Sequence, residues 1–130
     1  MTNAELISKA KLAAENAYAP YSHFTVGAAL LAKSGKVYLG CNIENVAFGP
    51  TNCAERTAFF KAISEGERNF EKIAIVGGKE HNFTDYCPPC GVCRQVMSEF
   101  CDDSFTIILG KNGDGYRELT LGEMLPCRFE

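Results

Sequence analysis

Apolar positions recur along the chain with two periods, one typical of helices and one typical of strands. Helical spacing over residues 4–18 predicts an amphipathic helix, which Pro20 ends. The apolar run 24–32 is followed, after a Ser-Gly turn, by a segment at 36–42 that alternates apolar and polar residues. These two runs predict a β-hairpin directly after the first helix.

The rest of the chain continues this alternation. A second helix is predicted over 53–64, with Thr51 or Asn52 as its N-terminal cap. A short buried strand is predicted over 73–76, closed by Gly77-Gly78. The remaining predicted elements are a helix over 91–100, strands over 105–109 and 116–120, and a helical turn over 121–125. This order predicts an α/β fold with helices on the faces of a mixed sheet.

Length and composition are those of an ordinary globular protein with one domain over residues 1–130. The net charge of −3 and the lack of a basic run argue against a nucleic-acid partner. No apolar run approaches the ~18 residues of a membrane span, and the N-terminus lacks a secretory pattern. Because seven cysteines occur without a sign of export, we expect a cytoplasmic protein with reduced thiols.

Three cysteines and a glutamate are spaced as a catalytic zinc site requires. Cys53 and Glu55 lie at the predicted start of the second helix, and Cys90 and Cys93 form a Cys-x-x-Cys pair at the start of the third. Three thiolates hold Zn²⁺ and leave one position for water, whereas a structural site uses four protein ligands. We therefore predict one catalytic zinc ion per chain, held by these three cysteines.

Cys87 leaves two alternatives open. Because Cys87-Pro88-Pro89-Cys90 is also a Cys-x-x-Cys sequence, Cys87 and Cys90 could be the ligating pair, or Cys87 could complete a four-cysteine structural site. We prefer Cys90 and Cys93, because they open a helix whose free N–H groups can hydrogen-bond to thiolate sulfur. Two prolines that lack N–H groups separate Cys87 from that helix. The remaining cysteines are expected to be packing residues: Cys41, Cys101 and Cys127.

Two residues next to Cys53 are candidates for supporting the chemistry. Glu55 lies in the first helical turn, where it can take a proton from water and deliver it to a ring nitrogen. Arg56 lies three residues after Cys53 on the same helix face, so its positive charge would offset the charge of three thiolates. We expect Glu55 to be catalytic and Arg56 to support the metal ligands.

Several longer motifs accompany these residues. They are C-A-E-R at 53–56, P-C-x-x-C-R-Q at 89–95, A-P-Y-S at 19–22, F-x-V-G-A-A at 24–29 and G-C-N-I-E-N at 40–45. With them, the chain resembles the cytidine deaminase family, specifically its small homotetrameric type. The resemblance covers most of the chain. It implies a three-layer α-β-α sandwich around a mixed five-stranded sheet.

The resemblance also implies roles for individual residues. The three cysteines named above would hold zinc, and Glu55 would shuttle protons. Asn42 and Glu44 would hydrogen-bond to the ribose hydroxyl. Phe24 would pack on the pyrimidine ring, and the backbone N–H of Ala54 would contact a pyrimidine oxygen.

The resemblance implies two further aromatic residues at the substrate site, Phe48 and Phe129. Phe129 resembles the C-terminal aromatic that, in the family, reaches the site of a neighbouring subunit. Phe48 stands where many relatives carry Tyr, so no hydroxyl is available for a contact there. The resemblance therefore implies a homotetramer in which neighbouring subunits complete each active site.

The expected activity is zinc-dependent hydrolytic deamination of cytidine and 2′-deoxycytidine to uridine and 2′-deoxyuridine, with release of ammonia, in pyrimidine salvage. A deaminase of another aminopyrimidine, such as blasticidin S, is an alternative, but the segment 42–45 favours a substrate that carries ribose. A structural zinc module that binds a protein partner is a third interpretation, which a four-cysteine site with Cys87 would support.

Overall fold

The computed structural model describes residues 1–130, and a five-stranded sheet forms its centre. The helices and strands follow one another as α1 (Asn3–Ala14), β1 (Phe24–Ala32), β2 (Val37–Cys41), α2 (Ala54–Ser64), β3 (Phe70–Lys79), α3 (Gly91–Phe100), β4 (Thr106–Gly110), β5 (Tyr116–Thr120) and α4 (Leu121–Met124). The predicted order of elements is therefore the observed one.

The sheet is mixed. Its strand order is β2-β1-β3-β4-β5, so the first hairpin lies at one edge and the last hairpin at the other. Strands β3 and β4 pair in parallel, and the other three pairs are antiparallel. Helix α3 makes the crossover between the two parallel strands, as a parallel pair requires.

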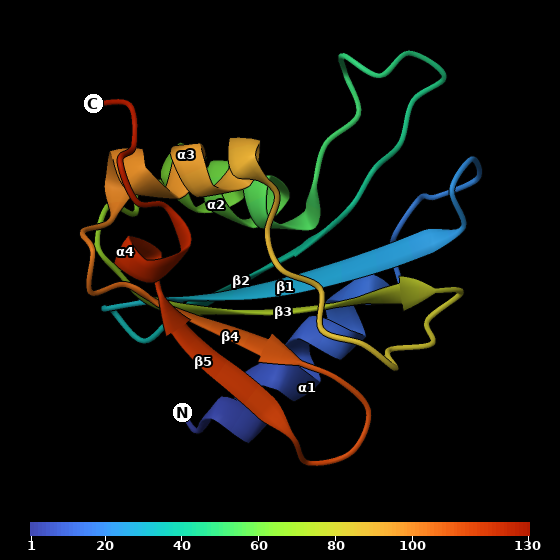
Figure 1. Cartoon of the computed structure of the whole chain (residues 1–130), viewed down its shortest axis with the longest axis horizontal. Coiled ribbons are helices and arrows are strands. Elements are labelled where there is room, and N and C mark those ends of the chain that lie inside the picture. Colours follow the sequence, from blue (N-terminus) through green and yellow to red (C-terminus); the bar gives the residue numbers. More distant parts are fainter.

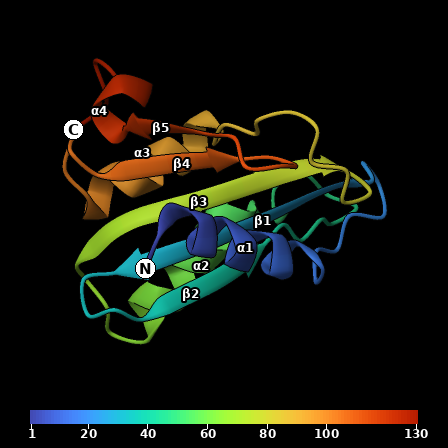
Figure 2. The same cartoon turned by 90° about the horizontal axis from the view of Figure 1, so that it is seen from below.

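Helices cover both faces of the sheet. Helix α1 lies on one face, and α2 and α3 lie side by side on the other (Figures 1 and 2). Each face has its own apolar core, one built around Phe59, Met97 and Ile107, the other around Leu6 and Ile108. This arrangement confirms the predicted α/β fold with three layers. None of the helices is long and apolar enough to cross a bilayer.

Three elements depart from the prediction in ways that the fold explains, whereas β2, β4 and α4 differ from it by one residue at one or both ends. Helix α1 ends at Ala14 and not near residue 18, because the backbone beyond it turns to pair with the segment after β2. Strand β3 continues through the two glycines that were expected to close it. Helix α2 is capped by Cys53, whose side chain makes no capping hydrogen bond, and not by Thr51 or Asn52.

Close packing brings α2 onto the sheet near the site. A Cβ atom on Gly40 of β2 would lie 2.4 Å from the carbonyl oxygen of Ala54 and 2.5 Å from the backbone nitrogen of Ala58. Only a glycine permits this approach. The first turn of α2, which follows Cys53, is thereby held against β2.

Candidate active site

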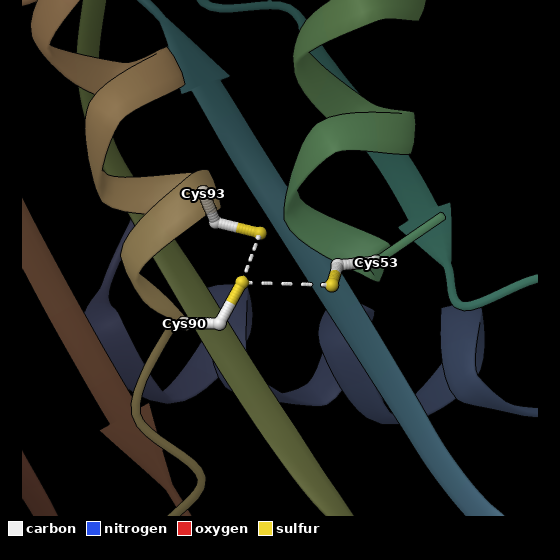
Figure 3. Close-up of side chains that lie close together, drawn as sticks. All are labelled: Cys53, Cys90 and Cys93. Atoms are coloured by element: carbon white, nitrogen blue, oxygen red, sulfur yellow. Dashed lines mark hydrogen bonds between the residues drawn. The ribbon is translucent and has the colours of Figure 1, made fainter. Parts of the chain in front are cut away.

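The N-termini of α2 and α3 meet above the sheet, and each presents a cysteine. Cys53 is the N-cap of α2 and Cys90 is the N-cap of α3, both with extended backbone. Cys93 follows one turn into α3 and is buried. The sulfur of Cys90 lies 3.8 Å from that of Cys53 and 3.3 Å from that of Cys93 (Figure 3). Three thiols from two separate helices thus point at one location.

The cluster of three thiols, Cys53, Cys90 and Cys93, has the dimensions of a zinc site. With Zn–S distances of about 2.3 Å and tetrahedral angles, ligand sulfurs are roughly 3.8 Å apart. In the structure the three sulfur atoms lie within 4.8 Å of one another. Thiolates are ligands that zinc prefers, so both the chemistry of the donors and their spacing fit one Zn²⁺ ion.

Arg56 places a positive charge beside the predicted metal ligands. Its Nη2 donates a hydrogen bond of 3.2 Å to the sulfur of Cys53. Hydrogen bonds from Cys93 and then from Arg56 lower the pKa of Cys53 to about 5. The pKa of Cys93 is raised, first because its thiol donates to the Cys53 sulfur and second because it is buried. Cys53 is therefore a thiolate at neutral pH.

Glu55 is a buried carboxyl beside these sulfurs. It lies in the first turn of α2 and is only 4% exposed. Burial raises its pKa to about 7, and the negative charge on Cys53 adds to this effect. A carboxyl group with a pKa near neutrality can both accept and release a proton at physiological pH, as a general acid–base catalyst must.

A pocket of about 260 Å³ opens above the thiols and Glu55. Seven of the sequence-predicted site residues line it: Phe24, Asn42, Glu44, Cys53, Ala54, Glu55 and Cys90. Four others do not: Phe48, Arg56, Cys93 and Phe129. Phe24 is 37% exposed, so its ring is available to a ligand. The structure therefore brings the ring of Phe24, the carboxyl group of Glu55 and the thiols of the cysteine cluster to one concave site.

The two residues expected to bind ribose already have partners in the protein. The side chain of Asn42 accepts from the backbone N–H of Val26 and donates to the carbonyl of Phe24. Glu44 accepts from the backbone N–H groups of Tyr21 and Ser22 and from the Ser22 hydroxyl. Both side chains are held in fixed positions at the pocket, and their contact with ribose stays a prediction.

The structure does not bring Phe48 and Phe129 into this pocket. Phe48 is 96% exposed and lines a second hollow with Tyr21 and Val46. Phe129 is 83% exposed, and its backbone carbonyl accepts a hydrogen bond from the side chain of Gln95. Within one chain, neither aromatic ring lies in the site.

Cys87 lies close to the site but is not part of the three-thiol cluster. The three-thiol cluster consists of Cys53, Cys90 and Cys93. The Cys87 sulfur packs against Gly77, where an added Cβ atom would lie 2.7 Å from it and 3.1 Å from the Phe24 ring. Burial raises the pKa of Cys87 to about 12, so it is a neutral thiol. Its position does not support a four-cysteine site.

Comparison with known proteins agrees with this geometry. The family described as "Cytidine and deoxycytidylate deaminase zinc-binding region" matches residues 1–109. The chain belongs to this family. A cytidine deaminase from Sporosarcina psychrophila is 50% identical over 125 residues, which cover 96% of this chain and 89% of that protein. The predicted resemblance is confirmed, and so is the zinc-binding character of the site.

The similar proteins include one with a solved crystal structure and one that is named for a different substrate. The crystal structure of cytidine deaminase from Burkholderia pseudomallei matches with a TM-score of 0.91 and 46% identity, over 99% of this chain and 100% of that one. Blasticidin-S deaminase from Bacillus cereus is 31% identical over 111 residues, which cover 80% of this chain and 76% of that protein.

Sequence reasoning missed some of the residues that line this deaminase pocket. Ser22 lies in the wall and donates to Glu44. The wall also includes Val26, Thr51, Asn52, Cys87 and Pro88. Ser22 belongs to the A-P-Y-S motif at 19–22, and this motif could have indicated its place in the pocket. Thr51 lies in an irregular loop and carries no comparable signal.

Proposed function

We propose that this chain catalyses the hydrolytic deamination of cytidine and 2′-deoxycytidine to uridine and 2′-deoxyuridine, with release of ammonia, in pyrimidine salvage. Residues 1–130 would act as one deaminase domain. The observation that carries the proposal is a cluster of three thiols, two of which line a single pocket together with the buried carboxyl group of Glu55.

Cys53, Cys90 and Cys93 would hold one Zn²⁺ ion. When bound, zinc supplies a water molecule that is acidic enough to act as a nucleophile near neutral pH. Arg56 donates a hydrogen bond to Cys53 and offsets part of the negative charge of the thiolates.

Glu55 carries the protons of the reaction in this proposal. It takes a proton from the attacking water and gives it to N3 of the pyrimidine as the bond to C4 forms. It then takes the remaining proton of the added water, now on the hydroxyl at C4, and delivers it to the amino group. Ammonia leaves and the 4-oxo product remains. The raised pKa of Glu55, about 7, suits a group that must alternate between both states.

The rest of the pocket would orient the nucleoside. Phe24 presents an exposed ring against which the pyrimidine packs, and the backbone N–H of Ala54 at the start of α2 would contact a pyrimidine oxygen. Asn42 and Glu44 would reach the ribose with the acceptor positions that their internal hydrogen bonds leave free.

The proposal includes assembly as a homotetramer. Phe129, and Phe48 with its neighbour Val46, are highly exposed in the single chain and lie outside the pocket. Large exposed apolar side chains grouped in this way are typical of interaction surfaces. A neighbouring subunit would cover Phe48 and insert Phe129 near the pocket. Because all seven cysteines are free thiols, we place the enzyme in the reducing cytoplasm.

The similarity to blasticidin-S deaminase makes blasticidin S a second candidate substrate. Both candidates share the C4 amino group, so they differ only in what binds beyond the ring. Glu44 at the pocket wall favours the nucleoside, because a carboxylate accepts hydrogen bonds from the hydroxyls of ribose.

An ultraviolet assay with cytidine, 2′-deoxycytidine and blasticidin S tests the function directly. We expect turnover of both nucleosides, at a higher kcat/KM than that of blasticidin S. Removal of metal with a chelator should abolish turnover, and added Zn²⁺ should restore it. Turnover that survives complete removal of zinc, or a preference for blasticidin S, would contradict the proposal.

A further inference from the structure

Arg94 is a half-buried residue on α3 that makes two short hydrogen bonds to backbone carbonyls. It directly follows Cys93 in the sequence. Its Nε donates to the carbonyl oxygen of Pro89 at 2.7 Å, and its Nη1 donates to that of Met124, also at 2.7 Å. Neither partner is a carboxylate, so the guanidinium group acts here through the geometry of its planar fork.

The first carbonyl belongs to the segment that carries a metal ligand. Pro89 precedes Cys90, the N-cap of α3, and its ring is fully buried. Two prolines in this segment lack N–H groups. Among the hydrogen bonds of the structure, the only one that involves residues 85–89 is the bond from Arg94. Arg94 is thus the single hydrogen-bonded support of the turn that places Cys90.

The second carbonyl belongs to the C-terminal part of the chain. Met124 is the last residue of α4, beyond which the chain passes over α3 (Figure 1). The next residue on α3, Gln95, donates from Nε2 to the carbonyl of Phe129 at 3.0 Å. Two consecutive residues of α3 therefore hold the segment that presents Phe129.

We propose that Arg94 is a positioning residue that fixes the Cys90 turn for metal binding and joins this turn to the C-terminal segment. The two carbonyls are bound by one rigid guanidinium group, so displacement of either segment disturbs the other. Zinc at the three thiols then orders residues 121–130, and order in these residues strengthens the hold on zinc. The inference rests on the proposed role of Cys90 as a ligand.

The test compares Arg94→Lys with a matched control. Lysine keeps the charge but offers a single ammonium group, which cannot reproduce the fork. Arg117→Lys is the control, because Arg117 is exposed on β5 and its side chain makes no hydrogen bond in the structure. Competition with a colorimetric chelator gives the zinc affinity of each protein. We expect Arg94→Lys to bind zinc about tenfold more weakly, as for residues that orient metal ligands, and Arg117→Lys to match the wild type.

Hydrogen exchange read by mass spectrometry tests the link to the C-terminal segment. The backbone N–H groups of Leu121, Gly122 and Leu125 are hydrogen-bonded and report on this segment. Zinc should slow their exchange in the wild type, and this effect of zinc should shrink in Arg94→Lys. Saturating zinc should also restore most of the kcat of Arg94→Lys, whereas a general loss of packing would not respond to the metal.

The outcomes separate this inference from the proposed function. If the wild type binds no zinc, or if Cys90→Ser binds it as tightly as the wild type, the proposed ligand set is wrong. If Cys90→Ser loses zinc but Arg94→Lys matches Arg117→Lys in affinity and exchange, the role of Arg94 is wrong. If Arg94→Lys does not fold by circular dichroism, Arg94→Gln is measured in its place, and unchanged zinc affinity there overturns the inference.

Discussion

A single carboxyl group decides whether the site can move protons. Glu55 is almost completely buried and lies two residues from the thiolate of Cys53, and both features raise its pKa, to about 7. The sequence predicted its catalytic role from its place beside Cys53 in a zinc-site pattern, although a first helical turn is also a common position for glutamate because of the helix dipole. Its burial and its place in the pocket wall were not evident from the sequence, because they depend on the contact of α2 with β2.

Replacement of Glu55 by glutamine should separate metal binding from catalysis. The amide has nearly the same shape but does not titrate, so Glu55→Gln should bind one zinc per chain and lose on the order of 10²–10⁴ in kcat. Metal analysis and the cytidine assay on the same sample give both quantities. Near-normal turnover in the variant would show that Glu55 is not the proton carrier.

Cys87 is the residue for which the sequence left alternatives. Its thiol packs against Gly77 and lines the same pocket as Cys53 and Cys90, but it is not one of the three clustered sulfurs. Cys87→Ala should therefore retain a full equivalent of zinc, whereas Cys90→Ser should lose most of it. Metal content after dialysis measures the difference. Depletion of zinc in Cys87→Ala would revive the four-cysteine interpretation.

At the scale of single elements, the sequence pattern was most reliable for elements that depend on local periodicity. Helix α3 begins at Gly91 and ends at Phe100, as predicted, because its apolar face is regular throughout. Helix α1 ends earlier than predicted because Tyr18 pairs with the segment after β2: its N–H donates to Asn42, and its carbonyl accepts from Glu44. Apolar spacing cannot reveal a pairing between residues so far apart.

The glycines of β3 illustrate a second limit of sequence patterns. Gly77-Gly78 is typical of a turn, but both residues lie within the strand, where Gly77 pairs with Val26. A Cβ atom on Gly77 would lie 2.7 Å from the Cys87 sulfur and 3.1 Å from the Phe24 ring. This glycine therefore leaves room for two residues of the pocket wall, a requirement that only the folded chain makes visible.

Substitution of this glycine should disturb both stability and substrate binding. Gly77→Ala forces Cys87 and Phe24 to move, so we expect a loss of about 1–3 kcal/mol in the free energy of unfolding and a raised KM for cytidine. Gly49→Ala is the control, since a Cβ atom there meets nothing within 4 Å. Addition of Cys87→Ala should recover part of the loss. Urea unfolding of the four proteins provides the measurement, and equal stability of Gly77→Ala and wild type would contradict the packing explanation.

At the scale of the whole molecule, the order of elements was sufficient to predict the layers, because a parallel pair of strands requires a crossover helix on one face. The meeting of the two helix starts was accessible only through the Cys-Ala-Glu and Cys-x-x-Cys motifs, which lie 37 residues apart from Cys53 to Cys90. The roles of Phe48 and Phe129 could not be resolved from one chain, since both rings point into solvent there.

Sharing of sites between subunits has a direct test in mixed oligomers. Phe129→Ala should keep its zinc and show a raised KM, because the aromatic ring at the C-terminal segment is lost while the three cysteine ligands and Glu55 remain. Glu55→Gln should be inactive but should still offer a normal Phe129 to its neighbours. When the two variants are unfolded together and refolded as mixed oligomers, some sites combine Glu55 from one subunit with Phe129 from another. We therefore expect low-KM activity that neither variant shows alone. Mixed oligomers that form by native mass spectrometry but show no such gain would mean that each chain completes its own site.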